Sequence, residues 1–223
     1  MPLFDFVFPV NCLGCGKSGK YICNLCIGRI LSPKNNCPYC QRASVDGVTH
    51  VKCQKKYGLD GLVSLWQYQG VIRQALIKLK YKYIREIANE LTELVERRTN
   101  IDPDILPKKA VMIPVPLYWY KENVRGFNQS AEIGKLISKK IGCEFFPDVL
   151  LRKKLKQAQT LLTAKKRKVN IKNVFAFNSK YILRSENYIL FDDVYTTGPT
   201  LKEAGKVLKR NGARNVWGLT IAR

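Results

Sequence analysis

Two adjacent carboxylates, Asp192 and Asp193, stand where a short apolar run gives way to a polar loop. Residues 188–191 before them are apolar and predict a buried strand. The loop after them reads Thr-Thr-Gly-Pro-Thr over residues 196–200 and leads into a helical pattern. At the carboxyl end of a parallel strand, loop amides, threonine hydroxyls and a helix N-terminus can bind a phosphate. The carboxylates would then face ribose hydroxyls or a divalent metal.

This order of residues resembles the 5-phosphoribosyl-1-pyrophosphate (PRPP) signature of type I phosphoribosyltransferases. The resemblance implies PRPP with magnesium as ligand or substrate, with Asp192 and Asp193 beside the ribose and the metal. Pro199 departs from the signature, where a small residue is usual, and removes one backbone N–H from the loop. The expected phosphate-binding segment is Val194, Tyr195, Thr196, Thr197, Gly198, Pro199 and Thr200.

A second set of chemically capable residues lies near the start of the chain. Seven of the eight cysteines precede residue 54, and six of them form Cys-x-x-Cys pairs. Each pair can direct two thiolates at one tetrahedral ion, so two pairs complete a structural zinc site. His50, the only histidine, lies close to Cys53 and can supply the eighth ligand. We therefore expect two zinc ions bound by Cys12, Cys15, Cys23, Cys26, Cys37, Cys40, His50 and Cys53.

The order along the chain favours sequential pairing of these ligands into two sites. The spacing leaves open an interleaved arrangement, in which the first pair joins the third and the second joins the fourth. An iron–sulfur cluster is a less favoured alternative. Both sites would be filled by protein ligands, so the module is expected to be structural or to form a docking surface.

The chain is strongly basic, with 39 Lys and Arg against 17 Asp and Glu and a formal net charge of +22. This balance points to a polyanionic partner. Between residues 149 and 185 there are eleven Lys or Arg and no Asp or Glu. A basic run can follow a nucleic-acid backbone, and aromatic side chains can stack on unpaired bases. The expected single-stranded DNA contacts are Arg152, Lys153, Lys154, Lys156, Lys165, Lys166, Arg167, Lys168, Tyr118 and Trp119.

The elements that position these residues follow from hydrophobic spacing after residue 57. We expect two helices over residues 71–97, broken near residues 80–83, and a buried strand over residues 110–116. Further helices are predicted over 131–140 and 200–211, and a closing strand over 216–221. This pattern predicts an open, mostly parallel α/β sheet with helices on both faces. A zinc-ribbon module would occupy residues 1–56 and the α/β domain residues 57–223.

Three separated motifs give a narrower resemblance. They are the opening Phe-Pro-x-x-Cys-x-x-Cys-Gly, the string Arg125-Gly-Phe-Asn-Gln129 after Pro-Val-Pro, and Gln159 with Arg167 and Asn170. Together they resemble the ComF family, a bacterial group of competence-associated proteins with a double zinc ribbon and a type I phosphoribosyltransferase-like domain. The resemblance implies that Arg125 lies on the pyrophosphate side of the pocket. His50 and Lys156 depart from the family pattern, which usually has cysteine and often threonine there.

The resemblance implies a protein that binds PRPP with magnesium and single-stranded DNA, and acts in DNA uptake and processing during natural transformation. The alternative is an active phosphoribosyltransferase that uses an unidentified acceptor and has no direct DNA role; turnover itself is left open. A competence helicase or DNA-processing protein is a possible partner. No uncharged apolar run approaches the roughly 18 residues of a membrane span, and the cysteine pairs are typical of intracellular metal sites. We therefore expect a cytoplasmic protein without membrane insertion.

Overall fold

A five-stranded parallel sheet organises the computed structural model, which describes residues 10–81, 84–101, 106–117, 126–153 and 173–223. The strand order is β1-β7-β6-β2-β3, and every neighbouring pair is parallel. A separate antiparallel pair, β4 with β5, covers part of one face. The strands are β1 (Gly61–Trp66), β2 (Ala110–Pro114), β3 (Glu144–Phe145), β4 (Leu150–Arg152), β5 (Phe175–Phe177), β6 (Asn187–Val194) and β7 (Asn215–Ala222).

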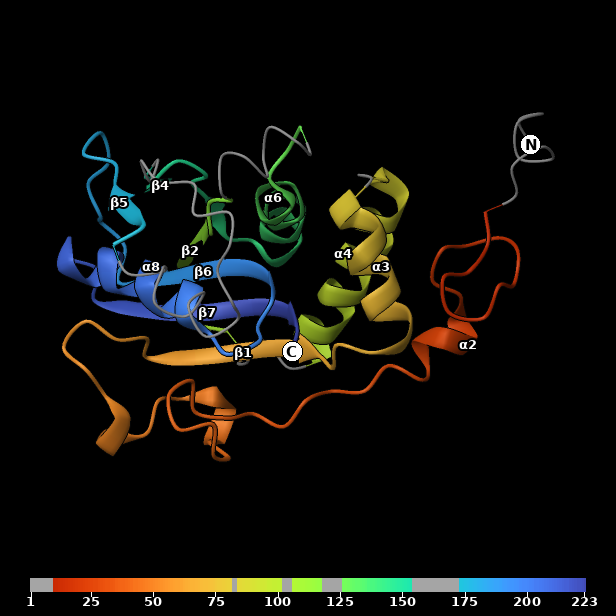
Figure 1. Cartoon of the computed structure of the whole chain (residues 1–223), viewed down its shortest axis with the longest axis horizontal. Coiled ribbons are helices and arrows are strands. Elements are labelled where there is room, and N and C mark those ends of the chain that lie inside the picture. Colours follow the sequence, from red (N-terminus) through yellow and green to blue (C-terminus); the bar gives the residue numbers. More distant parts are fainter. Residues whose placement is uncertain (1–9, 82–83, 102–105, 118–125, 154–172) are drawn as a thin grey trace, which may run out of the picture.

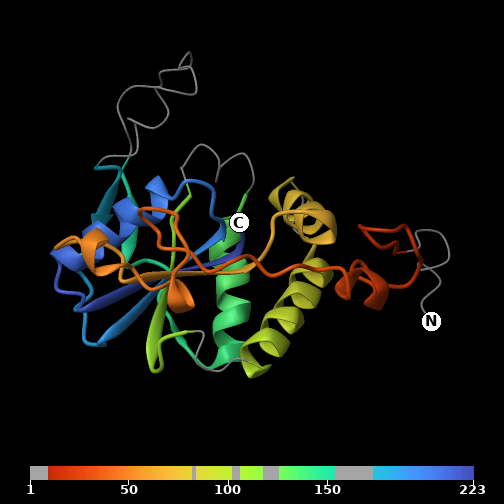
Figure 2. The same ribbon diagram turned by 90° about the horizontal axis from the view of Figure 1, so that it is seen from below.

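Helices cover both faces of this sheet, as the sequence predicts. One core joins α3 (Gly70–Tyr81), α4 (Arg85–Ile101) and α6 (Gln129–Ile141) to one face. Figure 2 shows α4 and α6 side by side. The other core joins α8 (Pro199–Arg210) and the β4–β5 pair to the opposite face. Alternate residues of β6 enter the two cores, because side chains on a strand point to opposite faces.

The crossovers from β2 and β6 leave these neighbouring strands in opposite directions. The chain runs from β2 through α6 to β3 at one edge, and from β6 through α8 to β7 on the other side. Such a reversal opens a crevice at the carboxyl ends of the two central strands, where ligands bind in open α/β sheets. The end of β2 and the start of α6, which flank the first loop of interest, therefore lie at this point, as do the end of β6 and the start of α8.

The expected helix break is confirmed, since α3 ends at Tyr81 and α4 begins at Arg85. The strands and helices predicted after residue 110 are also present, with their bounds shifted by a few residues. Strand β1 was not predicted. It is buried along its whole length beside β7, so it lacks the alternating pattern that marks a half-exposed strand.

The cysteine-rich segment contains only short helices and isolated bridges in its described part. These helices are α2 (Asn24–Ile27), η1 (Val45–Gly47) and η2 (Val51–Cys53). Figure 1 shows residues 10–27 beside α3 and α4, and the segment around η1 and η2 beneath β1 at the other end of the molecule. The segment between them bonds to the end of β1, where the Gln67 amide donates to the Leu31 carbonyl at 2.8 Å. A boundary near residue 56 stays a prediction.

Among the described helices, none combines the length and the apolar character needed to cross a membrane.

Candidate functional site

A cavity of about 310 Å³ lies at the crevice between β2 and β6. Its walls come from the end of β2, the start of α6, the end of α3 and the end of β6. Both predicted carboxylates line it, as does the hydroxyl-bearing Thr200 at the start of α8. The remaining lining residues are Lys80, Val115, Pro116, Leu117, Asn128, Gln129, Ser130 and Arg152. The structure therefore brings the described ends of the loop after β2 together at one polar site with the residues that flank the loop after β6.

The two carboxylates differ in their surroundings. Oδ1 of Asp192 accepts hydrogen bonds from the Ser130 hydroxyl and from the Asp193 amide, both at 2.9 Å. Burial, reinforced by repulsion from the Asp193 carboxylate, raises the pKa of Asp192 to about 7 despite these two hydrogen bonds. Asp193 Oδ1 accepts from the Val194 amide at 2.7 Å. In each acid Oδ1 accepts a hydrogen bond from the protein, so Oδ2 is the candidate oxygen for a ligand hydroxyl or a metal.

The loop after β6 turns sharply into α8 at Gly198. This residue has φ +80 and a side chain there would collide with Tyr195, because a Cβ would lie 2.3 Å from the Tyr195 hydroxyl oxygen. Pro199 occupies the first turn of α8, where a missing N–H breaks no helical hydrogen bond. The proline therefore fits the helix start. The following amides of the first turn have no acceptor within the helix and are available to an anion.

Tyr195 points away from the cavity. Its side chain is buried, and its hydroxyl donates to the Pro38 carbonyl at 3.0 Å. Its amide is also used, donating to the Ala222 carbonyl at 2.8 Å. Both groups already have partners, so the remaining candidate donors of the predicted segment are Thr196, Thr197, Gly198 and Thr200.

The start of α6 forms another wall of the cavity, next to Asp192. Asn128 caps this helix, and its side-chain oxygen accepts from the amides of Ser130 and Ala131. Gln129 is 2% exposed and donates to the Leu76 carbonyl at 3.4 Å. Its Oε1 has no hydrogen-bond donor within the described part of the chain. Because Gln129 lines the cavity, this oxygen is a candidate acceptor for a ligand hydroxyl.

Two cations of the cavity were not predicted as pocket residues. Lys80 reaches it from the last turn of α3, and Arg152 from the end of β4. Arg152 donates to the Pro116 carbonyl at 3.3 Å, and its guanidinium lies 5.3 Å from the centre of the Phe175 ring. The sequence predicts Arg152 as part of a DNA-binding run and indicates no role for Lys80. Neither position carries a local signal, because both depend on how distant elements pack.

The predicted metal ligands form two quartets in sequential order. Within each quartet the ligand atoms lie within 4.8 Å of one another. The quartets are Cys12, Cys15, Cys23 and Cys26, here the first cluster, and Cys37, Cys40, His50 and Cys53, here the second cluster. His50 Nδ1 lies 3.3 Å from Cys40 Sγ, and its Nε2 lies 3.0 Å from the Ala43 carbonyl oxygen. A carbonyl partner of this kind orients a metal-binding imidazole.

The thiols within each cluster are unequal. Burial disfavours the thiolates of Cys12 and Cys37, but backbone amides donate to both sulfurs and lower the pKa of each thiol to about 6. Burial and neighbouring thiols raise the pKa of Cys26 to about 12 and that of Cys53 to about 11. A divalent cation would offset this repulsion. Both donor sets fit a closed tetrahedral zinc ion, with three thiolates and one imidazole in the second cluster.

Several predicted contacts lie outside the described residues. They are Arg125 of the pyrophosphate side, and Tyr118, Trp119, Lys154, Lys156, Lys165, Lys166, Arg167 and Lys168 of the DNA-binding set. Lys153 is described and exposed, and its amide donates to the Val174 carbonyl. These roles stay predictions.

Comparison with known proteins gives relatives that align with between half and nearly all of the chain, although no protein-family model matches it. The DNA utilization protein YhgH of Shigella flexneri is 30% identical over 206 residues, which cover 87% of each chain. The competence protein ComFC of Bacillus subtilis is 27% identical over 219 residues, covering 95% of this chain and 83% of the relative. Competence protein F of Haemophilus influenzae is 37% identical over 114 residues, half of each chain. With these relatives and two metal-ligand clusters in place, the chain belongs to the ComF family of competence and DNA utilization proteins.

Proposed function

We propose that this protein binds PRPP with magnesium at the cavity between β2 and β6, as a phosphoribosyltransferase-like domain would. The observation that carries the proposal is the placement of Asp192 and Asp193 beside a loop that opens into α8 at a topological switch point. The 5′-phosphate would bind the loop of residues 196–200. The ribose hydroxyls would bind the carboxylates, and the pyrophosphate would extend toward Lys80 and Arg152, with Arg125 as a further expected contact.

The residues present fit a magnesium ion. Carboxylate oxygens are the ligands that magnesium takes from proteins, usually together with substrate oxygens and water. Oδ2 of Asp192 and of Asp193 are the candidate protein ligands, because Oδ1 of each is held by hydrogen bonds. When bound, the ion would neutralise charge on the diphosphate. Ser130 would keep the Asp192 carboxylate in one orientation.

The experiment is calorimetry with PRPP and Mg²⁺ on the full chain and on Asp193→Asn. Loss of one charge-assisted hydrogen bond, worth about 1.5–3 kcal/mol, should weaken PRPP binding about tenfold or more. Asp148→Asn is the matched control, because Asp148 is exposed and does not line the cavity. Equal PRPP affinity in all three proteins would contradict the proposed site.

The proposed biological role is DNA uptake and processing, with single-stranded DNA as the partner. Two relatives are named competence proteins and a third is named a DNA utilization protein. The net charge of +22 supports binding to a polyanion. We further propose a cytoplasmic location, and a helicase or DNA-processing protein as the protein partner.

A second candidate is phosphoribosyl transfer to an acceptor. Lys80 and Arg152 favour it, because cations in the same cavity as the acids could stabilise a departing pyrophosphate. Transfer would break the bond between the anomeric carbon and the pyrophosphate oxygen and join that carbon to the acceptor. The test is PRPP-dependent release of pyrophosphate across candidate acceptors. Release that persists in Asp193→Ala would contradict catalysis at this site.

A further inference from the structure

We propose that the second cluster holds the loop of residues 196–200, here called the phosphate loop, in its binding conformation. Tyr195 is the positioning residue between the cluster and this loop. A metal ion at Cys37, Cys40, His50 and Cys53 and a phosphate ligand at residues 196–200 would then stabilise each other. The mutual effect rests on the proposed function, whereas the mechanical support of the loop by the cluster does not.

The direct link is a hydrogen bond between the loop and the metal-binding turn. Pro38 lies between the ligands Cys37 and Cys40, and its carbonyl accepts from the Tyr195 hydroxyl at 3.0 Å. This hydroxyl also accepts from Gln41 Nε2 at 3.1 Å. Tyr195 is 2% exposed, so water cannot replace these partners without opening the contact.

Gln41 adopts its position through the metal-binding turn itself. Its backbone is left-handed, with φ +62, and its amide donates to the Cys37 carbonyl at 3.0 Å. Its Oε1 accepts from the Arg223 guanidinium at 2.7 Å, and this guanidinium lies 5.5 Å from the centre of the Tyr195 ring. The turn, Arg223 and Tyr195 therefore form one connected network.

On its other side, the Tyr195 ring fills the bend of the phosphate loop. The space next to Gly198 is occupied by this ring, since a Cβ at position 198 would lie 2.4 Å from one of its carbon atoms. The bend at Gly198, which leads to Thr200 at the cavity, thus packs directly on a side chain held by the second cluster.

A second contact reaches the first turn of α8. Tyr39, also between Cys37 and Cys40, accepts from the Leu59 amide at 2.9 Å. Lys202 Nζ lies 5.2 Å from the centre of the Tyr39 ring and 3.4 Å from the Thr197 carbonyl oxygen. The same metal-binding turn therefore contacts the loop at Tyr195 and, through Lys202, at Thr197.

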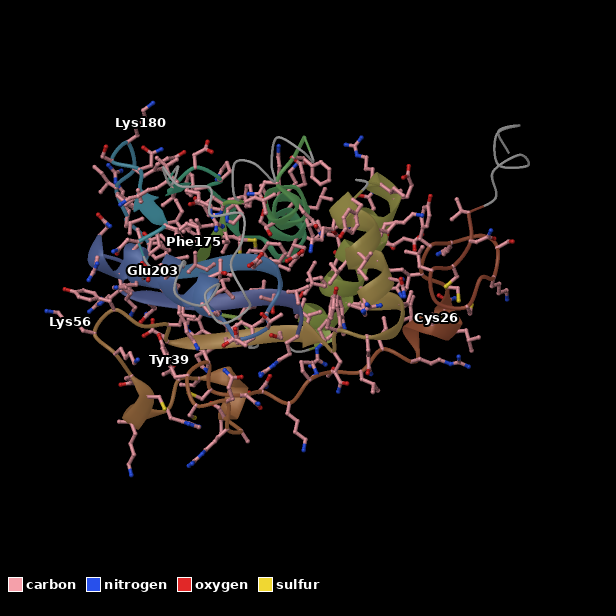
Figure 3. The ribbon with its side chains drawn as sticks, in the orientation of Figure 1. Cys26, Tyr39, Lys56, Phe175, Lys180 and Glu203 are labelled. Atoms are coloured by element: carbon pink, nitrogen blue, oxygen red, sulfur yellow. The ribbon has the colours of Figure 1, made fainter. Side chains whose placement is uncertain are left out.

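The first cluster has no such contact in the described part of the chain and serves as an internal control. It packs against α3 and α4, where the Ile22 amide donates to Glu90 at 2.6 Å. Figure 3 shows Cys26 of the first cluster far along the long axis of the molecule from Tyr39, which lies between two ligands of the second cluster. Loss of the first metal should therefore leave the phosphate loop unchanged.

The first experiment measures hydrogen exchange of residues 195–202 in the full chain without PRPP. Cys40→Ser and Cys15→Ser remove equivalent ligands, each the second cysteine of the first pair in its cluster. We expect exchange in this segment to rise about tenfold or more in Cys40→Ser and to stay unchanged in Cys15→Ser. Equal exchange in the two variants would overturn the proposal.

Tyr195→Phe tests the link while keeping every metal ligand. It should retain two zinc ions per chain by metal analysis, and still show faster exchange in residues 195–202. If Tyr195→Phe exchanges like the parent protein, the hydrogen bond to Pro38 does not hold the loop and the proposal fails. This variant keeps the test decisive even where Cys40→Ser unfolds the second cluster.

The second experiment measures zinc transfer to a coloured chelator with and without PRPP and Mg²⁺. Cys15→Ser disrupts the first cluster, so the zinc of this variant reports the second cluster. Cys40→Ser disrupts the second cluster, so its zinc reports the first. At equilibrium, PRPP should raise the zinc affinity of the second cluster several-fold and leave that of the first unchanged, because coupling between two binding sites is reciprocal. PRPP that binds without raising the zinc affinity of the second cluster would contradict the coupling. Absence of PRPP binding would contradict the proposed function and leave the exchange result to decide the mechanical support.

Discussion

At the residue scale, the surroundings of Asp192 oppose the ionised form that ligand binding requires. It must be ionised to bind a metal or accept from a ribose hydroxyl, yet burial and the neighbouring Asp193 hold its pKa at about 7. The Ser130 hydroxyl lowers this pKa, so it favours the form that a cationic ligand requires. Perturbed carboxyls of this kind cluster at functional sites, because stability is given up there for ligand binding.

Asp192→Asn should raise thermal stability more at pH 8.5 than at pH 5.5. In the unfolded chain the carboxyl ionises near pH 4, whereas in the folded protein it does so near pH 7. The folded state binds more protons across this window, so its free energy of unfolding falls as pH rises. Removing the charge should therefore recover about 1 kcal/mol at pH 8.5, or about 2–4 °C in Tm.

The measurement is thermal denaturation without Mg²⁺ at both pH values. Asp148→Asn serves as the reference for loss of an exposed carboxylate. A Tm gain for Asp192→Asn that is the same at both pH values would show that the Asp192 pKa is not raised.

At the element scale, the turn from β6 into α8 decides the shape of the phosphate loop. Gly198→Ala should destabilise the protein and weaken PRPP binding, because the new Cβ meets the Tyr195 ring in addition to the strain of φ +80. Gly212→Ala is a matched control, with φ +100 and open space around its Cβ position. We expect Gly198→Ala to cost about 1–3 kcal/mol more than Gly212→Ala in urea denaturation. Equal costs would show that the Tyr195 ring does not pack on the bend.

A helix cap gives a second prediction at this scale. Asn128→Ala removes the side-chain oxygen that accepts from two amides at the start of α6, and should cost about 1 kcal/mol. Asn128→Asp keeps an acceptor there and should retain most of the stability. Thermal denaturation measures both, and an unchanged Tm in Asn128→Ala would contradict the capping role.

These elements also show which parts of the site can be predicted from the sequence. The loop after β6 and the metal ligands were predictable, because apolar runs, turn residues and Cys-x-x-Cys spacing are local signals. Lys80 and Arg152 were not predictable as pocket residues, since α3 and β4 meet only after the sheet forms. The metal-ligand quartets were predictable as groups, but the contact of the second one with Tyr195 joins residues 157 positions apart.

At the scale of the whole molecule, positive charge should dominate binding to DNA. Each phosphate contact of a single strand contributes about −0.7 to the slope of log affinity against log salt. The double variant Lys165→Glu with Lys166→Glu should weaken single-strand affinity and flatten this slope by about 1–2. Lys135→Glu with Lys139→Glu, on the exposed side of α6, changes the net charge equally and should have a smaller effect. Fluorescence anisotropy over a salt series makes the comparison, and identical slopes in both variants would remove the basic run from the DNA site.

The second cluster lies far before Tyr195 in the sequence, so it is synthesised first during translation. All four ligands are present once residue 53 has been synthesised, whereas Tyr195 and Arg223 are synthesised much later. Domains begin to fold from their N-terminal side during synthesis, and a site built from neighbouring residues can load its metal early. The turn that carries Pro38 and Gln41 can therefore fold first and act as a template, the surface on which the later loop packs. A shortage of zinc during translation would leave the last-made part of the ligand site without this template.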